Sequence, residues 1–116
     1  MLRLIKNDYL LFLLKVMYFQ KKILRSWINP SFLNTNHLQI NENAIDYFKE
    51  NPDKINWSYL SLNPNAIELL RENQDKIDWP MLSKNPAAIE LLKENLEKID
   101  WKMLSANTAI FEEIVV

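Results

Sequence analysis

The sequence of 116 residues contains neither cysteine nor glycine. Without cysteine there is no disulfide framework, no thiolate metal site and no cysteine nucleophile. Without glycine the chain cannot form a glycine-rich phosphate loop or a dinucleotide-binding fingerprint. Asparagine, by contrast, occurs fourteen times, and it is the residue that most often replaces glycine in the left-handed conformation at helix ends. We therefore expect asparagines at the ends of helices.

Residues that could carry chemistry are also few. The single histidine, His37, lies in a polar stretch with no second histidine to join it, so we interpret it as a surface residue and not as a metal ligand or catalytic base. Acidic pairs such as Glu68 with Glu72 recur from one repeat to the next, as a solvated helix face does. A catalytic pair would be made once and placed in a cleft. We predict no enzymatic activity, no cofactor and no metal.

The feature that organises the chain is a repeated unit of 22 residues. Residues 63–84 return almost unchanged as residues 85–106, and residues 41–62 are a looser copy. Self-similarity at such a period is the sequence signature of a stacked repeat array. Leucine-rich repeats share this period, but the L-x-L strand signature that they need is absent. We interpret the three copies as helical repeats within one domain.

Each unit is predicted to contain two short helices. Asn63-Pro64 starts the first helix, because asparagine caps it and proline takes the first helical position, where a missing N–H costs nothing. This helix is expected to end near Asn73 in one unit and Asn95 in the next, with the asparagine in the left-handed cap conformation. A second helix is expected where an amide or acid precedes the tryptophan of each unit, at Asn56, Asp78 and Asp100.

Such a helix pair cannot bury its own apolar face, so neighbouring units must stack. We predict an all-α fold, a short helical-repeat array that resembles an α-solenoid. A tryptophan and an isoleucine from each unit are predicted to line the core between units. These structural core residues are Trp57, Trp79, Trp101, Ile55, Ile77 and Ile99.

The two borders of the repeat region are predicted to be atypical, as terminal repeats usually are. Residues 29–40 are interpreted as a degenerate half-repeat or linker, with Thr35 in the position of the tryptophan. Residues 107–116 begin another copy and then leave the pattern, and Phe111 with Ile114 suggests a capping half-helix there.

Residues 1–28 do not belong to the repeat. Apolar residues three or four positions apart define one uncharged helical stripe: Ile5, Tyr9, Phe12, Val16, Phe19, Ile23 and Trp27. Residues 1–25 hold six basic residues against one acid, whereas the rest of the chain is acidic. The apolar run is too short to span a membrane, which takes about 20 residues, and no signal-peptide cleavage site follows it. We expect an N-terminal amphipathic helix that caps the first repeat; alternatively, it lies on an anionic membrane or in a partner's groove.

Binding is expected where the units differ on a common scaffold. Tyr59, Met81 and Met103 each stand two residues after a tryptophan. They either pack between layers or form an apolar contact ridge for a partner protein. The other predicted contact residues belong to the N-terminal stripe: Ile5, Tyr9, Phe12, Val16 and Phe19. Because the repeats are acidic, nucleic acid is not an expected partner.

The unit N-P-x-A-I-E-L-L-x-E-N-x-x-K-I-D-W-x-x-L-S around Trp79 and Trp101 resembles a short tandem repeat abundant in giant DNA viruses of algae and amoebae. The resemblance covers about residues 41–113 and departs at Glu42, where that family prefers proline. It implies a viral protein of the virion or the infected host's cytoplasm, not a secreted one. We expect a non-catalytic, minor capsid-type structural protein that contacts other capsid or virion proteins. The alternatives are a peripheral membrane protein held by residues 1–28 and an adaptor for a host factor.

Overall fold

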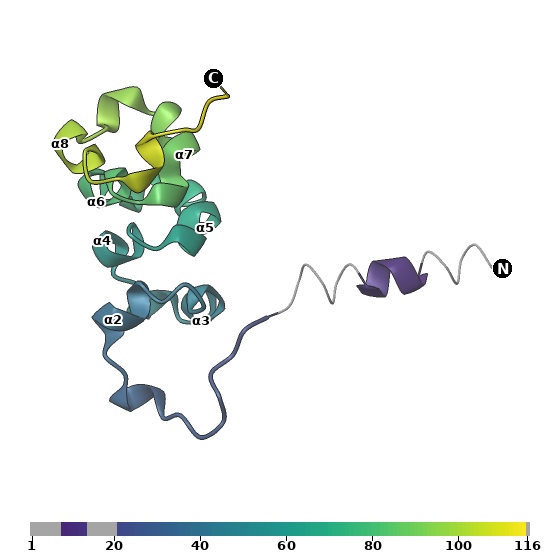
Figure 1. Ribbon diagram of the computed structural model, residues 1–116. Coiled ribbons are helices and arrows are strands. Elements are labelled where there is room, and N and C mark those ends of the chain that lie inside the picture. The colour runs from purple at the N-terminus through teal and green to yellow at the C-terminus, as the bar shows by residue number, and fades with distance from the viewer. Residues whose placement is uncertain (1–7, 14–20, 116) are drawn as a thin grey trace.

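The computed structural model describes residues 8–13 and 21–115, and this part of the chain is helical with no strand. The predicted all-α class is therefore confirmed for these residues. Figure 1 shows two columns of short helices that alternate along the chain. One column contains α2 (Thr35–Gln39), α4 (Trp57–Leu60), α6 (Trp79–Ser83) and α8 (Trp101–Leu104). The other contains α3 (Ile45–Glu50), α5 (Ile67–Arg71) and α7 (Ile89–Lys93).

Short 3-10 turns precede most of these helices. They are η1 (Pro30–Phe32), η2 (Pro52–Lys54), η3 (Pro64–Ala66), η4 (Gln74–Lys76), η5 (Pro86–Ala88), η6 (Leu96–Lys98) and η7 (Thr108–Ile110). Residues 63–84 and 85–106 thus share one order of elements, 3-10 turn, helix, 3-10 turn, helix. In residues 41–62 a hydrogen-bonded turn replaces the first 3-10 turn, and this is the copy with Glu42 in place of the proline.

The predicted helix starts are confirmed. The Asn63 side chain accepts the N–H of Asn65 at 3.0 Å, and Pro64 follows the cap directly. At the second start of the same unit, Asp78 Oδ1 accepts the N–H of Met81 at 3.1 Å. These caps satisfy backbone donors that the helix itself leaves unpaired.

The left-handed caps predicted at Asn73 and Asn95 are wrong. Their φ angles are −136° and −135°, and no residue of the described segments has a positive φ. Each asparagine instead donates its side-chain amide to a carbonyl four residues earlier, Asn73 to Leu69 at 2.8 Å. Because the side chain satisfies an end carbonyl, the chain can enter the next 3-10 turn without reversing φ.

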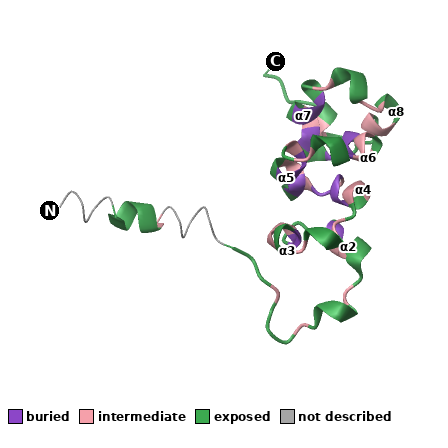
Figure 2. Cartoon of the chain, turned by 180° about the vertical axis from the view of Figure 1, so that it is seen from behind, coloured by how far each residue is buried: buried purple, intermediate pink, exposed green. Residues whose placement is uncertain are grey.

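The core runs between the two columns of helices, as the burial colours of Figure 2 show. Its buried apolar residues are Ala44, Phe48, Leu60, Ala66, Leu69, Leu70, Ile77, Leu82, Ala88, Leu91 and Leu92. Of the six core residues predicted from the sequence, only Ile77 is buried; Ile55, Ile99, Trp57 and Trp79 pack half-buried against the cluster. Trp101 is 64% exposed, so its predicted core position is wrong.

The tryptophans lie at the edge of the core because leucines fill its centre. Trp57 and Trp79 are each covered by a lysine from the following unit, with Lys76 Nζ 5.1 Å and Lys98 Nζ 4.9 Å from the ring centroids. Such a cation over the face of an indole is attracted by the ring quadrupole. Among the described residues no lysine covers Trp101 in this way.

This difference predicts unequal losses of stability on truncation. We expect Trp79→Ala to lower the free energy of unfolding by about 2–4 kcal/mol, because it removes core packing and a cation–π contact. Trp101→Ala should cost less than about 1 kcal/mol, because most of that ring is already in water. Urea denaturation of both variants measures the two losses, and equal losses would contradict the assigned exposures.

Residues 8–13 are helical, but they do not provide the predicted cap. Tyr9 and Phe12 are each 61% exposed, so no repeat residue covers this described part of the stripe. Ile5, Val16 and Phe19 lie outside the described residues. Among the residues that the structure does describe, no helix is long and apolar enough to cross a membrane.

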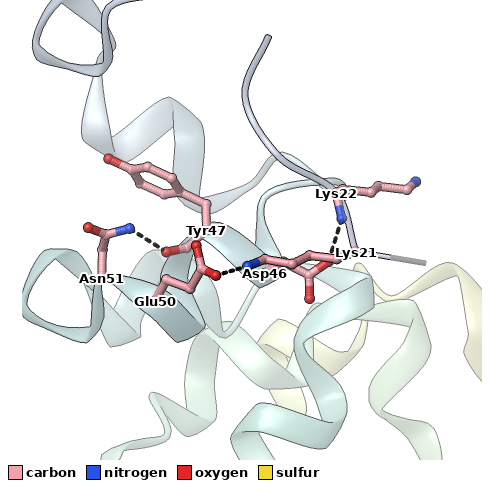
Figure 3. Close-up of polar contacts among 6 residues, drawn as sticks. All are labelled: Lys21, Lys22, Asp46, Tyr47, Glu50 and Asn51. Carbon is pink, nitrogen blue, oxygen red and sulfur yellow. Dashed lines mark hydrogen bonds and ion pairs between the residues drawn. The ribbon is translucent and has the colours of Figure 1, made fainter. Parts of the chain in front are cut away.

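The predicted helix does not continue through residues 21–28, which form an irregular segment with one turn. Figure 3 shows how this segment is held on α3: the backbone N–H of Lys22 donates to Asp46 Oδ2 at 2.9 Å, and Lys21 pairs with Glu50. These polar contacts replace helical hydrogen bonds and leave Ile23 77% exposed and Trp27 79% exposed.

The capping half-helix predicted for residues 107–116 is also wrong over the described part. The 3-10 turn η7 ends at Ile110, and Phe111 is extended with φ −103° and ψ 136°. The cause is the residue at position 110. The equivalent residues Ala66 and Ala88 are fully buried at 0% exposure, a space too small for isoleucine, and Ile110 is accordingly 40% exposed.

Candidate interaction surface

An asparagine at the start of each unit ties it to the unit before. Asn85 Nδ2 donates to the carbonyls of Ser61 and Asn63, at 3.0 Å to each. Asn63 and Asn107 make the equivalent pairs of bonds to carbonyls 22 and 24 residues earlier. All three asparagines are buried, with exposures of 0–2%. A buried carbonyl without a partner is costly, so these bonds fix how successive units sit on one another.

A serine at the end of the second helix makes a further link between units. Ser61 Oγ donates to the carbonyl of Trp57 and accepts the N–H of Asp78 at 3.1 Å. Ser83 Oγ repeats this arrangement, accepting the N–H of Asp100 at 3.1 Å. Ser105 donates to its own helix, but no residue of the described chain donates to it from a following unit.

One ion pair also crosses between units, from α5 to the end of α7. Arg71 Nη1 lies 2.7 Å from Glu94 Oε2, and Nη2 lies 3.2 Å from Oε1, a bidentate geometry. The hydrogen bond from Arg71 lowers the pKa of Glu94 below its ordinary value. Both groups are on the surface, where such pairs contribute little to stability.

Replacing Arg71 should change the pKa of the Glu94 carboxylate. We expect Arg71→Met to raise the pKa of Glu94 towards its ordinary value, because the charged form loses its donor. In the unaltered chain a lowered folded-state pKa means that the contribution of this pair is present above the unfolded pKa and is lost as the pH falls through the folded pKa. NMR titration of the Glu94 side chain measures its pKa in the unaltered chain and in Arg71→Met. An unchanged midpoint in Arg71→Met would contradict the pairing.

The last full unit leaves an open apolar groove of about 600 Å³ along α7 and α8. Leu96 and Trp101 are its most exposed apolar residues, at 59% and 64%. The groove is lined chiefly by Ile89, Leu92, Leu96, Ile99, Trp101 and Leu104. In the preceding unit the equivalent face is covered by α7 and α8 themselves, so this is an inter-unit surface without its neighbour.

A second groove, of about 680 Å³, lies before the first full unit, between residues 21–28 and the helices α2 and α3. Ile23, Leu24 and Ile28 line it from the irregular segment. Its rim carries the basic residues Lys21, Lys22 and Arg25, of which the two lysines bind α3 and the turn before it. Both borders of the stacked units therefore present apolar surface.

The predicted contact ridge is only partly exposed. Tyr59 is 40% exposed, whereas Met81 and Met103 are half-buried. Sequence reasoning did not identify the groove beside Trp101. The signal that could have found it is the departure of residues 107–116 from the repeat pattern, because each covered tryptophan receives its lysine from the unit that follows it.

Within residues 8–13 and 21–115, no three His, Cys, Asp or Glu side chains gather in a way that could hold a metal ion. His37 lies exposed in α2. No family model, no curated protein and no solved structure matches this chain. The candidate site is therefore defined by the residues and contacts described above.

Proposed function

We propose that the chain is a non-catalytic, α-solenoid-like repeat protein that acts through protein–protein contacts. The observation that supports this function is the open groove beside Trp101, at the border of units that otherwise cover one another. Exposed apolar surface of this extent, rimmed by polar residues, is typical of an interaction site. Trp101 would be its anchor, since aromatic residues dominate the energetics of interfaces.

The resemblance of the repeat unit to tandem repeats of giant DNA viruses provides the biological setting of this proposal. The chain would be a minor capsid-type component of a virion, or would act during assembly in the cytoplasm of the infected host. Its partners would then be capsid or other virion proteins.

The test is retention of virion proteins by the immobilised full chain. The variant Trp101→Lys removes the anchor, and Ile40→Lys is its matched control, because Ile40 is 48% exposed and the equivalent position Lys84 carries lysine naturally. We expect solubilised proteins from virions of the encoding virus to bind the unaltered chain and the control, but not Trp101→Lys. Equal retention by all three proteins, or retention by none, would contradict the proposed contact surface.

A second candidate function is peripheral membrane binding through residues 1–28. The observation that favours it is the exposure of four successive apolar residues in the described helix, by 55–61%: Tyr9, Leu10, Leu11 and Phe12. With the basic residues around them, they fit a helix lying in the surface of an anionic bilayer.

Flotation with phosphatidylserine-containing vesicles tests the membrane function. The double variant Leu11→Glu with Phe12→Glu should abolish flotation of the full chain, whereas Ile40→Glu with Tyr59→Glu adds the same charge to exposed body positions and should not. An unaltered chain that stays with the soluble fraction would refute the membrane function and leave the protein-contact function standing.

A further inference from the structure

The first and last second helices of the array each present one half of the contact that joins neighbouring units, here called the joint. Within the array, α4 contacts α2, α8 contacts α6, and the N–H of Asp78 before α6 binds Ser61 after α4. The 3-10 turn before each of these helices also contacts the previous second helix, through Lys54, Lys76 and Lys98. Residues 29–39, which form η1 and α2, are the same half-unit at the first border. Among the described residues no further second helix precedes α2, and only the 3-10 turn η7 follows α8.

We propose that the open face of α8 binds η1 and α2 of a second copy of this chain, in the register of the internal joints. This inference rests on the proposed protein-contact function and names the partner as a second copy. The partner is identified by the joints that the array already contains, because the face on α8 is the one that α6 uses to bind η6 and α8.

The hydrogen-bonding groups agree with this register. Asn34 caps α2 by accepting the N–H of His37 at 2.9 Å, as Asp78 and Asp100 cap α6 and α8. The backbone N–H groups of Asp78 and Asp100 donate to the serine of the preceding unit. In the proposed joint the N–H of Asn34 in the second copy therefore donates to Ser105 Oγ.

The aromatic groups agree as well. Phe32, the last residue of η1, stands 22 residues before Lys54 and so occupies the position from which Lys76 and Lys98 cover a tryptophan. Phe32 is 86% exposed and Trp101 is 64% exposed. The joint would place one ring against the other, an aromatic contact in place of the internal cation–π contacts.

Charge at the borders favours this direction of assembly. Lys21, Lys22 and Arg25 lie beside α2, and Glu112 lies beside the open face of α8 with Glu113 following it, all of them exposed. Contact between α2 of one copy and α8 of another would therefore bring opposite charges to the joint. A tail-to-tail arrangement would instead place like charges together, which costs free energy.

The chain's lack of cysteine permits a direct test of the register. Thr35→Cys and Ser105→Cys are exposed substitutions at positions that the joint brings together, and they leave Phe32 and Trp101 intact. The two single variants, one carrying a mass tag, are mixed and treated with a short bismaleimide. We expect a mixed product of one tagged and one untagged chain, and no product when Ser105→Cys is treated alone.

Self-association is measured on the full chain by sedimentation velocity. Because a head-to-tail contact does not close on itself after two copies, the average mass should rise beyond that of a dimer as concentration increases. Trp101→Lys and Phe32→Glu should each weaken association at least about tenfold, as loss of an interface anchor does, while Ile40→Lys should not.

A product from Ser105→Cys alone would indicate a tail-to-tail dimer and overturn the proposed register. Absence of any mixed product, with a mass that stays monomeric, would overturn self-association. Loss of virion-protein retention in Trp101→Lys would still support the protein-contact function in that case, so the two proposals fail separately.

Discussion

Asn85→Ala is expected to lower the free energy of unfolding by about 2–4 kcal/mol. The substitution removes the bonds from Asn85 Nδ2 to two carbonyls and the cap on the N–H of Ala87. The carbonyl of Ser61 would lose this buried donor, and that of Asn63 would keep only the N–H of Ala66. Chemical denaturation followed by circular dichroism measures the loss.

Asn65→Ala is the matched control for this experiment. Asn65 also donates its side-chain amide to a carbonyl of the preceding unit, that of Glu42 at 2.8 Å, but it is exposed. Water can replace this donor, so we expect a change within about 0.5 kcal/mol. If both variants lost the same stability, burial would not be what makes the bonds of Asn85 important.

Phe48→Ala should be the most damaging single truncation, with a loss of about 3–5 kcal/mol. Phe48 is 0% exposed and packs edge-to-face against Tyr47, with ring centroids 5.6 Å apart. Truncation leaves a cavity in the core of the first full unit. Thermal and urea unfolding both report the effect.

Two further variants give this prediction its controls. Phe111→Ala removes the same side chain at a position that is 86% exposed, and should change stability by less than about 0.5 kcal/mol. Phe48→Leu should recover most of the lost stability, because the equivalent positions Leu70 and Leu92 are filled by leucine. A Leu variant as unstable as the Ala variant would show that ring shape, and not filled volume, is required at this position.

Features that depend on local chemistry could be predicted from the sequence. The caps at Asn63 and Asp78 follow from which side chain can accept an N–H two or three residues ahead. The same logic identified the α-helical class. These predictions need no knowledge of what packs against the element.

Features that depend on a neighbour could not be predicted in this way. Trp101 shares the local sequence Lys-Ile-Asp-Trp with Trp79, but α7, α8 and Lys98 pack beside Trp79, and no described element packs in this way beside Trp101. The departure from the repeat pattern at Ile110 likewise depends on the space left for a buried alanine. Residues 21–28 keep an apolar helical period, yet polar contacts with α3 hold them in an irregular path.

The buried asparagines determine how the chain would unfold under a stretching force. Each one donates hydrogen bonds to carbonyls 22 and 24 residues earlier, in the neighbouring unit only. Each unit is therefore stabilised by contacts with its immediate neighbours. A force applied to the two ends of the chain would break the contacts between units one at a time. Each rupture would release one unit of 22 residues, about 70–80 Å of extended chain. Such a protein would unfold under tension in several steps, one unit at a time, and not in a single event.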